Sequence, residues 1–424
     1  MFKAIIEASV RFRWFVIIAV SLVAALGLFE LTKLPIDAVP DITNRQVQIT
    51  TVAPALAPEQ IERQVTYPLE TALAGIPGLT STRSLSRNGF SQITAIFTDR
   101  TDIYFARQQV AERLAAASEG LPEGVEPALS PITTGLGEVL MWTVDYVPFS
   151  TKSLAKPGEP GWQAGGGYLT PEGERLSTPE QRATYLRTVQ DWIIAPQMRT
   201  TSGLAGVDTV GGYVKEYAVR PDAARLSAYG LGLGDLVEAV ERANTQAGAG
   251  YIQRAGEALV VRTDALALTI GDLAQAPVVN RGGLVVRVAD VATVEIGQAP
   301  RLGGASRDGH EAVLGTALMI AGGNSRTVAQ AAADRLAVVD DSLPPSIVAI
   351  PVLNRSELVN STIATVARNL TEGALLVVVV LFLLLGNIRA ATITALMIPL
   401  SFLFAVIGMN RFGISGNLMS LGAL

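Results

Sequence analysis

The sequence predicts a protein that combines membrane-spanning α-helices with a large α+β soluble region, and three observations carry that prediction. Three long apolar spans, Trp14–Leu31, Leu370–Leu385 and Ala390–Met409, come close to the roughly 20 residues that cross a ~30 Å hydrocarbon core at 1.5 Å per residue. A gap of some three hundred residues separates the first span from the second. Within this gap, the sequence periods of strands and helices alternate. The chain therefore places one large soluble region between its first two membrane helices.

The composition of the 424 residues agrees with this mixture of two classes. Charged residues make up 17% and hydrophobic residues 49%, which is too apolar for an ordinary soluble domain and too polar for a protein that lies mostly in the membrane. The net charge of −5 gives no indication of a nucleic-acid partner. The absence of cysteine excludes disulfides and thiolate metal sites, and His310 is the one histidine.

The first span, in residues 1–33, is predicted to be an uncleaved membrane anchor. Its apolar stretch exceeds the roughly 7 to 15 residues of a signal-peptide core, and no small-x-small cleavage site follows it. Lys3, Arg11 and Arg13 precede this span, and Arg389 lies between the second and third spans, so both places are expected on the cytoplasmic side. The soluble region is then expected on the opposite side, which in a Gram-negative cell is the periplasm.

The remaining membrane segments are predicted at 358–386 and 389–410, with the start of another at 416–424. An apolar stretch begins at Asn417 and stops at Leu424, far short of the length that crosses a bilayer. We expect the chain to end inside a fourth helix, and the alternative is a short tail at the membrane interface.

Residues 34–134 are predicted to form a first α/β unit. The predicted elements are, in order, a strand (47–53), a helix (58–73), two strands (80–86 and 92–97), a helix (103–117) and an extended piece that ends near 132. Asn88-Gly89 is a hairpin signal between the two middle strands, and Asp102 is suited to cap the second helix. The order β-α-β-β-α-β is the split βαβ pattern of ferredoxin-like folds.

A second unit repeats this order but is interrupted, so that it comprises 135–214 and 298–357. Its predicted elements are a strand (139–146), a helix (179–198), a strand (207–210), a strand (312–320), a helix (326–338) and a strand (347–352). Residues 152–178, rich in glycine and proline, are predicted to be a surface loop without a core of its own.

The interruption, 215–297, is predicted to be an inserted module with its own elements. These are strands at 215–220, 258–263, 284–288 and 291–296 and helices at 222–229 and 235–244. The glycine-rich stretch 246–256 is interpreted either as a flexible loop or as an arm that reaches a neighbouring subunit.

Several segments in order along the whole chain resemble the heavy-metal efflux branch of the resistance-nodulation-division (RND) transporters. They are Pro35-Ile-Asp-Ala-Val-Pro-Asp-Ile42, Gln46-Val-Gln-Ile-Thr-Thr-Val-Ala-Pro54, Glu62-Arg-Gln-Val-Thr-Tyr-Pro-Leu-Glu70, Leu186-Arg-Thr-Val-Gln-Asp-Trp192, Val210-Gly-Gly-Tyr-Val-Lys-Glu-Tyr217, Gly386-Asn-Ile-Arg-Ala390 and Gly416-Asn-Leu-Met-Ser-Leu-Gly-Ala-Leu424. The match is specific for the family and less so for the metal.

This resemblance implies two periplasmic ferredoxin-like porter subdomains after the first helix, the second split by a docking subdomain whose arm reaches the next protomer of a homotrimer. It also implies a bacterial inner-membrane pump that hands its cargo to a periplasmic adaptor protein and an outer-membrane channel. Family members take up protons on carboxylates of the fourth helix, at positions beyond Leu424, so the chain is expected not to pump alone. Glu30 and Glu372, near the ends of their spans, are interpreted as interfacial anchors.

The candidate metal ligands are Glu138 and Asp191. Without cysteine, ligands in this chain are limited to carboxylates, methionines, carbonyls and His310, which suits borderline divalent ions better than Cu(I). Glu138 follows the passage from the first unit to the second, next to the cleft expected between porter subdomains, and the alternative is a solvated acid at a strand end. Asp191 is alternatively a surface charge on a helix. His310 is interpreted as a turn residue before a strand, and Met141, Met198 and Met319 as core residues.

No catalytic motif is present, so we expect a transporter and not an enzyme. The sequence lacks a Gly-x-Ser-x-Gly elbow, a phosphate-binding loop and a HExxH motif, and no cofactor other than the transported metal is expected. The predicted function is that of the N-terminal half of a proton-driven exporter of cations such as Zn, Co, Ni or Cd. The alternatives are an RND-type drug or lipid exporter and a membrane-anchored periplasmic sensor.

Overall fold

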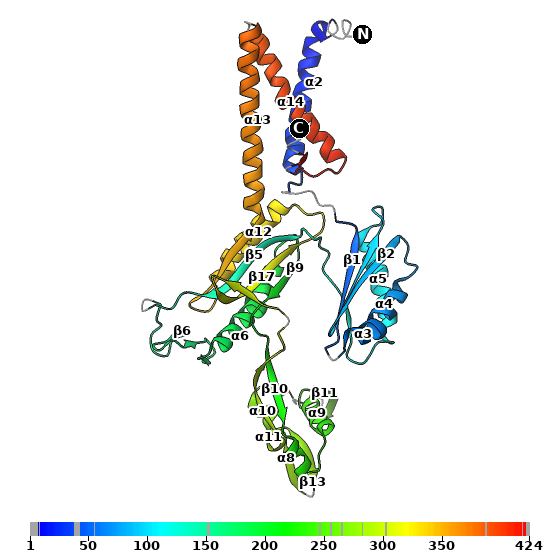
Figure 1. Ribbon diagram of the computed structural model, residues 1–424, viewed down its shortest axis with the longest axis vertical. Coiled ribbons are helices and arrows are strands. Elements are labelled where there is room, and N and C mark those ends of the chain that lie inside the picture. Colours follow the sequence, from blue (N-terminus) through cyan, green and yellow to red (C-terminus); the bar gives the residue numbers. More distant parts are fainter. Residues whose placement is uncertain are drawn as a thin grey trace.

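The protein is elongated in the computed structural model, with long helices at one end, two α/β bodies in the middle and a smaller body at the other end (Figure 1). The structure describes residues 7, 9–37, 43–54, 56–150, 153–245, 247–254, 257–263, 266–281, 283–301, 303–385, 388–417 and 419–420. The predicted start of a fourth membrane helix therefore falls largely outside the described residues, because residues 418 and 421–424 are not among them.

Three helices among the described residues are long and apolar enough to cross a membrane. They are α2 (Arg13–Lys33), α13 (Arg355–Leu385) and α14 (Ile388–Arg411). Helix α13 begins well before the predicted apolar span, because its polar first turns continue out of the membrane segment and pack against the second α/β body. Helices α2 and α14 approach closely at Gly27, where an added Cβ would lie 2.7 Å from the Cβ of Leu403. Near the same end Glu30 accepts a hydrogen bond from Asn410.

The first α/β unit is a four-stranded antiparallel sheet with helices on one face. Its strands are β1 (Gln46–Val52), β2 (Leu79–Arg87), β3 (Phe90–Phe97) and β4 (Pro127–Leu129), and its helical segments are α3 (Pro58–Ile61), η1 (Glu62–Thr66), α4 (Tyr67–Leu73) and α5 (Ile103–Ser118). The sheet order is β2-β3-β1-β4. Strand β1 alternates buried and half-buried residues, so Val47 and Ile49 enter the core between sheet and helices.

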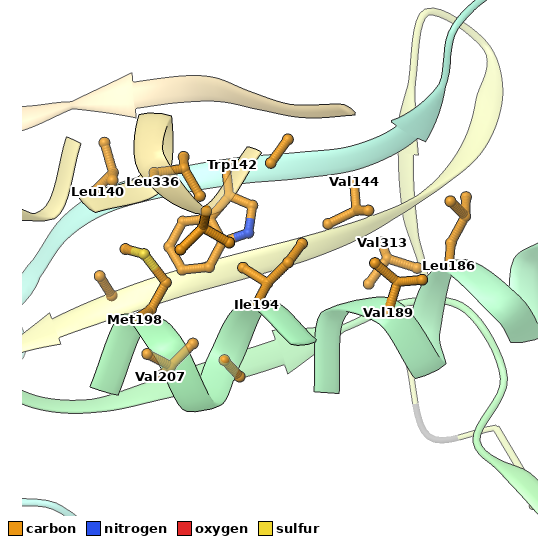
Figure 2. Close-up of a cluster of buried hydrophobic side chains, with 14 of the residues drawn as sticks. Leu140, Trp142, Val144, Leu186, Val189, Ile194, Met198, Val207, Val313 and Leu336 are labelled. Atoms are coloured by element: carbon orange, nitrogen blue, oxygen red, sulfur yellow. The ribbon is translucent and has the colours of Figure 1, made fainter. Parts of the chain in front are cut away.

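The second α/β unit has the same arrangement. Its elements are β5 (Glu138–Tyr146), α6 (Pro179–Val189), η2 (Gln190–Ile194), α7 (Ala195–Arg199), β9 (Leu204–Val210), β16 (Ala305–Arg307), β17 (His310–Met319), α12 (Ser325–Asp340) and β18 (Ile347–Asn354). The main strands lie in the order β9-β17-β5-β18, and all neighbouring pairs are antiparallel. The short strand β16 pairs with the first residues of β17. Figure 2 shows the core, in which Trp142 of β5 lies between Ile194, Met198 and Leu336.

The prediction of a coreless surface loop at 152–178 is wrong for the described residues 153–178. This segment contains a three-stranded sheet, β6 (Gly161–Trp162), β7 (Tyr168–Leu169) and β8 (Arg175–Leu176). Trp162 donates a hydrogen bond to the Val147 carbonyl (2.9 Å), and Tyr168 donates one to the Pro345 carbonyl (2.7 Å). Both rings pack into the core of the second unit, and burial raises the pKa of Tyr168 above its usual range. Aromatic burial therefore orders a segment whose composition is that of a loop.

The inserted module hangs from the second unit on a two-stranded stalk. The stalk pairs β10 (Lys215–Pro221) with β15 (Ala292–Gln298), and between them lie α8 (Ala223–Ala228), α9 (Leu233–Arg242), β11 (Ala247–Arg254), β12 (Glu257–Thr263), α10 (Ile270–Gln275), β13 (Pro277–Arg281), β14 (Leu284–Arg287) and α11 (Val288–Val291). In the glycine-rich stretch, residues 247–254 form β11 and pair with β12, so a flexible loop is the wrong interpretation there. Residues 246, 255 and 256 lie outside the described residues.

Candidate functional site

The candidate ligand Asp191 lies on a π-helical turn, which sequence reasoning missed because it predicted one uninterrupted helix. The turn, η2, ends two residues before Pro196. Proline lacks the N–H that would bond to the carbonyl four residues earlier, and its ring clashes with that carbonyl, so the helix widens here. The first unit repeats the pattern, with η1 ending two residues before Pro68. The proline inside each predicted helix was the available signal, and π turns are frequent at functional sites.

The first three side chains of the π turn differ in burial. Gln190 is fully buried, accepts a hydrogen bond from the Trp142 indole (2.9 Å) and donates one to the Thr209 hydroxyl (3.4 Å). Trp192 is 79% exposed on the other side. Asp191, half-buried between them, is held in place because its neighbour is tied to the sheet.

Asp191 is paired with a cation of the protein itself. Its Oδ2 lies 2.6 Å from Arg187 Nε, and Arg187 also donates to the Gly211 carbonyl (3.0 Å). The pair borders a cavity of about 390 Å³ at the base of the stalk, which Trp192 and Tyr217 also line. A metal ion at Asp191 would therefore have to displace the Arg187 guanidinium, and the open cavity gives it access.

Glu138, the other candidate ligand, is the exposed first residue of β5. Its backbone is fixed: the Met319 N–H donates to the Gly137 carbonyl (2.7 Å), and Arg355 donates to the Glu138 carbonyl (3.3 Å). Gly137 leaves no room for a side chain, because an added Cβ would meet the Thr133 hydroxyl and lie 3.3 Å from the Met319 carbonyl. The Glu138 carboxylate thus projects from a rigid strand end.

The structure does not assemble these residues into a ready-made metal centre. Among the described residues, no group of three or more His, Asp and Glu side chains is arranged to hold a metal ion. Met198 and Met319 are buried in the core of the second unit, as predicted, whereas Met141, also predicted to be a core residue, is only half-buried. His310, predicted to be a turn residue, is instead the exposed first residue of β17 and pairs with Arg307 of β16.

A second group of charges, missed by sequence reasoning, surrounds Asp145 on β5. Burial raises the pKa of this carboxyl, and the nearby charges of Arg307 and His310 only partly oppose that effect. Asp145 accepts a hydrogen bond from the Tyr146 N–H (2.8 Å), and Arg307 donates to the Thr143 hydroxyl (3.2 Å). Strand pairing brings these residues together, so only the register of the sheet could have revealed them.

Known proteins match this sequence along its whole length. The model of the AcrB/AcrD/AcrF family matches residues 5–424. The nickel-cobalt-cadmium resistance protein NccA of Alcaligenes xylosoxydans xylosoxydans and the nickel and cobalt resistance protein CnrA of Cupriavidus metallidurans are each 54% identical over the full chain, which covers 40% of their length. The cation efflux system protein CusA of Escherichia coli is 32% identical, with 38% of its length covered.

A solved structure shows the same likeness. The crystal structure of a heavy metal efflux pump (crystal form II) superposes with a TM-score of 0.80 at 31% identity, covering 97% of this chain and 38% of that one. The chain thus spans about two fifths of the length of the proteins it matches. It belongs to the AcrB/AcrD/AcrF family, and the relatives that it matches along its whole length include proteins named for heavy-metal resistance and efflux.

Proposed function

We propose that residues 1–424 are the N-terminal portion of a proton-driven RND exporter of divalent cations such as Ni, Co, Cd or Zn. The observation that carries this proposal is the 54% identity, along the full chain, to proteins named for resistance to nickel, cobalt and cadmium. The metal is cargo and not a cofactor, and the protein is a secondary transporter and not an enzyme.

The two α/β units serve as the ferredoxin-like porter subdomains in this proposal, and the module on the β10–β15 stalk serves as the docking subdomain. Support comes from the strand orders, since β2-β3-β1-β4 in the first unit corresponds position by position to β9-β17-β5-β18 in the second. Each sheet also follows a β-α-β-β-α-β order once the inserted module is set aside.

In this proposal the protein lies in the bacterial inner membrane and its soluble region lies in the periplasm. Three apolar helices and the position of the whole soluble region between α2 and α13 support this topology. Assembly as a homotrimer with a periplasmic adaptor and an outer-membrane channel is part of the same proposal, and it rests on the family to which the chain belongs.

Glu138 and Asp191 are the proposed metal ligands of this portion. Carboxylate oxygens suit Zn²⁺ and its divalent neighbours, and both acids belong to the second unit. The Arg187–Asp191 pair gives Asp191 two states: paired with Arg187 in the absence of metal, and released toward the cavity when a cation competes.

A chimera tests the function. Residues 1–424 replace the corresponding segment of NccA, and the chimera is expressed in a bacterial host that lacks metal exporters. We expect growth on nickel, cobalt or cadmium concentrations that arrest the empty host, and loss of that growth when Glu138→Gln and Asp191→Asn are introduced together. A membrane-inserted chimera that leaves the host fully metal-sensitive would contradict the proposal. Tolerance to dyes or bile salts instead would favour the drug or lipid exporter.

A further inference from the structure

Five segments far apart in sequence converge where the membrane helices join the second unit (Figure 1). They are the residues after α2, the passage into β5, the start of α12, the start of α13 and the residues after α14. The backbone links two of them directly: the Asp37 N–H donates to the Gly416 carbonyl (2.9 Å), and the Gly416 N–H donates to the Pro35 carbonyl (2.8 Å). The ends of α2 and α14 are thereby joined.

Arg355, the first residue of α13, ties the second membrane helix to the sheet. Its NH1 group donates to the carbonyls of Leu136 and Glu138, the residues that lead into β5. Its side chain is only 11% exposed, and its Nε lies 3.7 Å from Asp37 Oδ1. The guanidinium fork therefore spans from the α2 linker to the backbone of the candidate ligand Glu138.

Asp37 is held from a third side. The fully buried Ser325, at the start of α12, donates its hydroxyl to Asp37 Oδ1 and lies 3.3 Å from the Ile36 carbonyl. The Asp37 side chain is 18% exposed. Asp37, Ser325 and Arg355, called here the junction triad, thus join α2, α12 and α13 at one point.

The ion pair in the triad is suited to positioning more than to stability. Arg355 Nε is buried without a hydrogen-bond partner, so its link to Asp37 is a charge attraction at 3.7 Å and not a closed hydrogen bond. The desolvation cost of such a pair offsets most of its attraction, while removing one partner leaves a buried charge uncompensated. The pair contributes little net stability and fixes the relative position of the segments it joins.

We propose that Arg355, oriented by Asp37 and Ser325, is a positioning residue that makes the Glu138 strand end follow the membrane helices. A shift of α2 or α13 then moves the Leu136 and Glu138 carbonyls with it, because both are bonded to Arg355. The role assigned to Glu138 rests on the proposed function, whereas the mechanical link itself does not.

Spin-label distances test the link in the chain itself. The sequence has no cysteine, so Thr32→Cys at the end of α2 and Gly135→Cys before β5 provide the two labels, and both sites are exposed. An added Cβ at Gly135 meets no atom within 4 Å. We expect a narrow distance distribution in lipid vesicles, its loss in Arg355→Gln and Asp37→Asn, and partial retention in Arg355→Lys, which keeps the charge without the fork.

Arg326→Gln is the matched control. Arg326 Nε donates to Asn360 Oδ1 (2.7 Å) and so also joins α12 to α13, but outside the triad. Its variant should keep the narrow distribution. Unchanged widths in both Arg355→Gln and Asp37→Asn would overturn the proposal. Asp37→Asn preserves the side-chain shape, so it remains informative if Arg355→Gln fails to fold.

Transport in the NccA chimera separates the two proposals. Arg355→Gln should lower the maximal efflux rate by roughly tenfold, as loss of a residue that orients a metal ligand does, with Arg326→Gln unchanged. A chimera that exports no metal, with the spin-label result as expected, refutes the function and leaves the link standing. A chimera that exports metal equally well with Arg355→Gln, with unchanged label distances, refutes the link alone.

Discussion

Gly315→Ala is the perturbation that most directly tests how tightly the core of the second unit packs around Trp142, whose indole bonds to Gln190. Gly315 of β17 lies opposite Trp142 of β5 in the sheet register. An added Cβ would meet the indole ring, at 2.5 Å from Cζ2 and 2.6 Å from Nε1. The Trp142 side chain is fully buried in the core of the second unit, where Figure 2 shows it between Ile194, Met198 and Leu336.

The expected cost has two parts. Overpacking a dense core costs roughly 1–3 kcal/mol. If the indole moves, its hydrogen bond to Gln190 breaks and leaves a buried donor without a partner, which costs roughly 1–3 kcal/mol more. Gly315→Ala should therefore lower the free energy of opening of β5 and β17 amides by about 2–6 kcal/mol, measured by hydrogen exchange.

The double variant Gly315→Ala, Trp142→Phe shows whether the indole is the cause. Phenylalanine lacks the Nε1 and Cζ2 atoms that the new methyl group meets, so adding Gly315→Ala to Trp142→Phe should cost much less than adding it to the native chain. The amides of β1 and β3, in the other unit, serve as an internal control and should not change. Native-like opening energies in Gly315→Ala, or strictly additive effects in the double variant, would refute the reasoning.

Three further predictions concern the same unit. Asp145→Asn should raise the unfolding free energy at pH 7–8. Burial raises the pKa of Asp145, so ionising this carboxyl at that pH destabilises the native state. The charge of Asp308 adds to the rise in pKa, while the charges of Arg307 and His310 oppose it. The gain should decrease as the pH falls toward 4 and be absent below about pH 3, where the carboxyl is protonated in both states, and denaturation at two pH values checks this. Asp191→Asn should change the free energy of unfolding by roughly 1 kcal/mol or less but weaken Zn²⁺ binding, as measured by calorimetry. The control variant Glu159→Gln, which breaks the exposed ion pair with Lys156, should leave Zn²⁺ binding unchanged. Tyr168→Phe should lower the opening energy of β7 by about 1 kcal/mol through loss of the Pro345 hydrogen bond, and a loss confined to other strands would contradict this.

Elements with a strong period were predictable from the sequence because local pattern and tertiary burial agree in them. The predicted helix over 103–117 is α5 (Ile103–Ser118), capped by Asp102 as expected, with its side chain accepting from the N–H groups of Tyr104 and Phe105. The hairpin at Asn88-Gly89 connects β2 to β3, with Gly89 at a positive φ of 66°. Turn chemistry and alternation are local, so one sequence suffices to find them.

Features that depend on distant partners were missed for a physical reason. The strands in 153–178 are two residues each and are stabilised by the burial of Trp162 and Tyr168, and the Tyr168 hydroxyl bonds to the Pro345 carbonyl, 177 residues later. The junction triad joins Asp37 to Ser325 across 288 residues, and nothing in either local sequence indicates the other. The candidate ligands were identified by residue type, while their actual surroundings, such as Arg187 beside Asp191, came only from the fold.

The two π turns differ in the charges that they carry, and this difference supports our proposal that Asp191 of the second unit is a metal ligand. Aligned on Pro68 and Pro196, the exposed Arg63 and Gln64 of the first unit correspond to the half-buried Asp191 and the exposed Trp192 of the second, while the exposed Glu62 corresponds to the buried Gln190. The backbone device is the same in each, since a proline two residues past the turn widens both helices. The guanidinium of Arg63 repels a metal ion, and the carboxylate of Asp191 at the equivalent position attracts one. The fold supplies two similar platforms, and the proposed ligand Asp191 differs from its counterpart Arg63 by the sign of its charge.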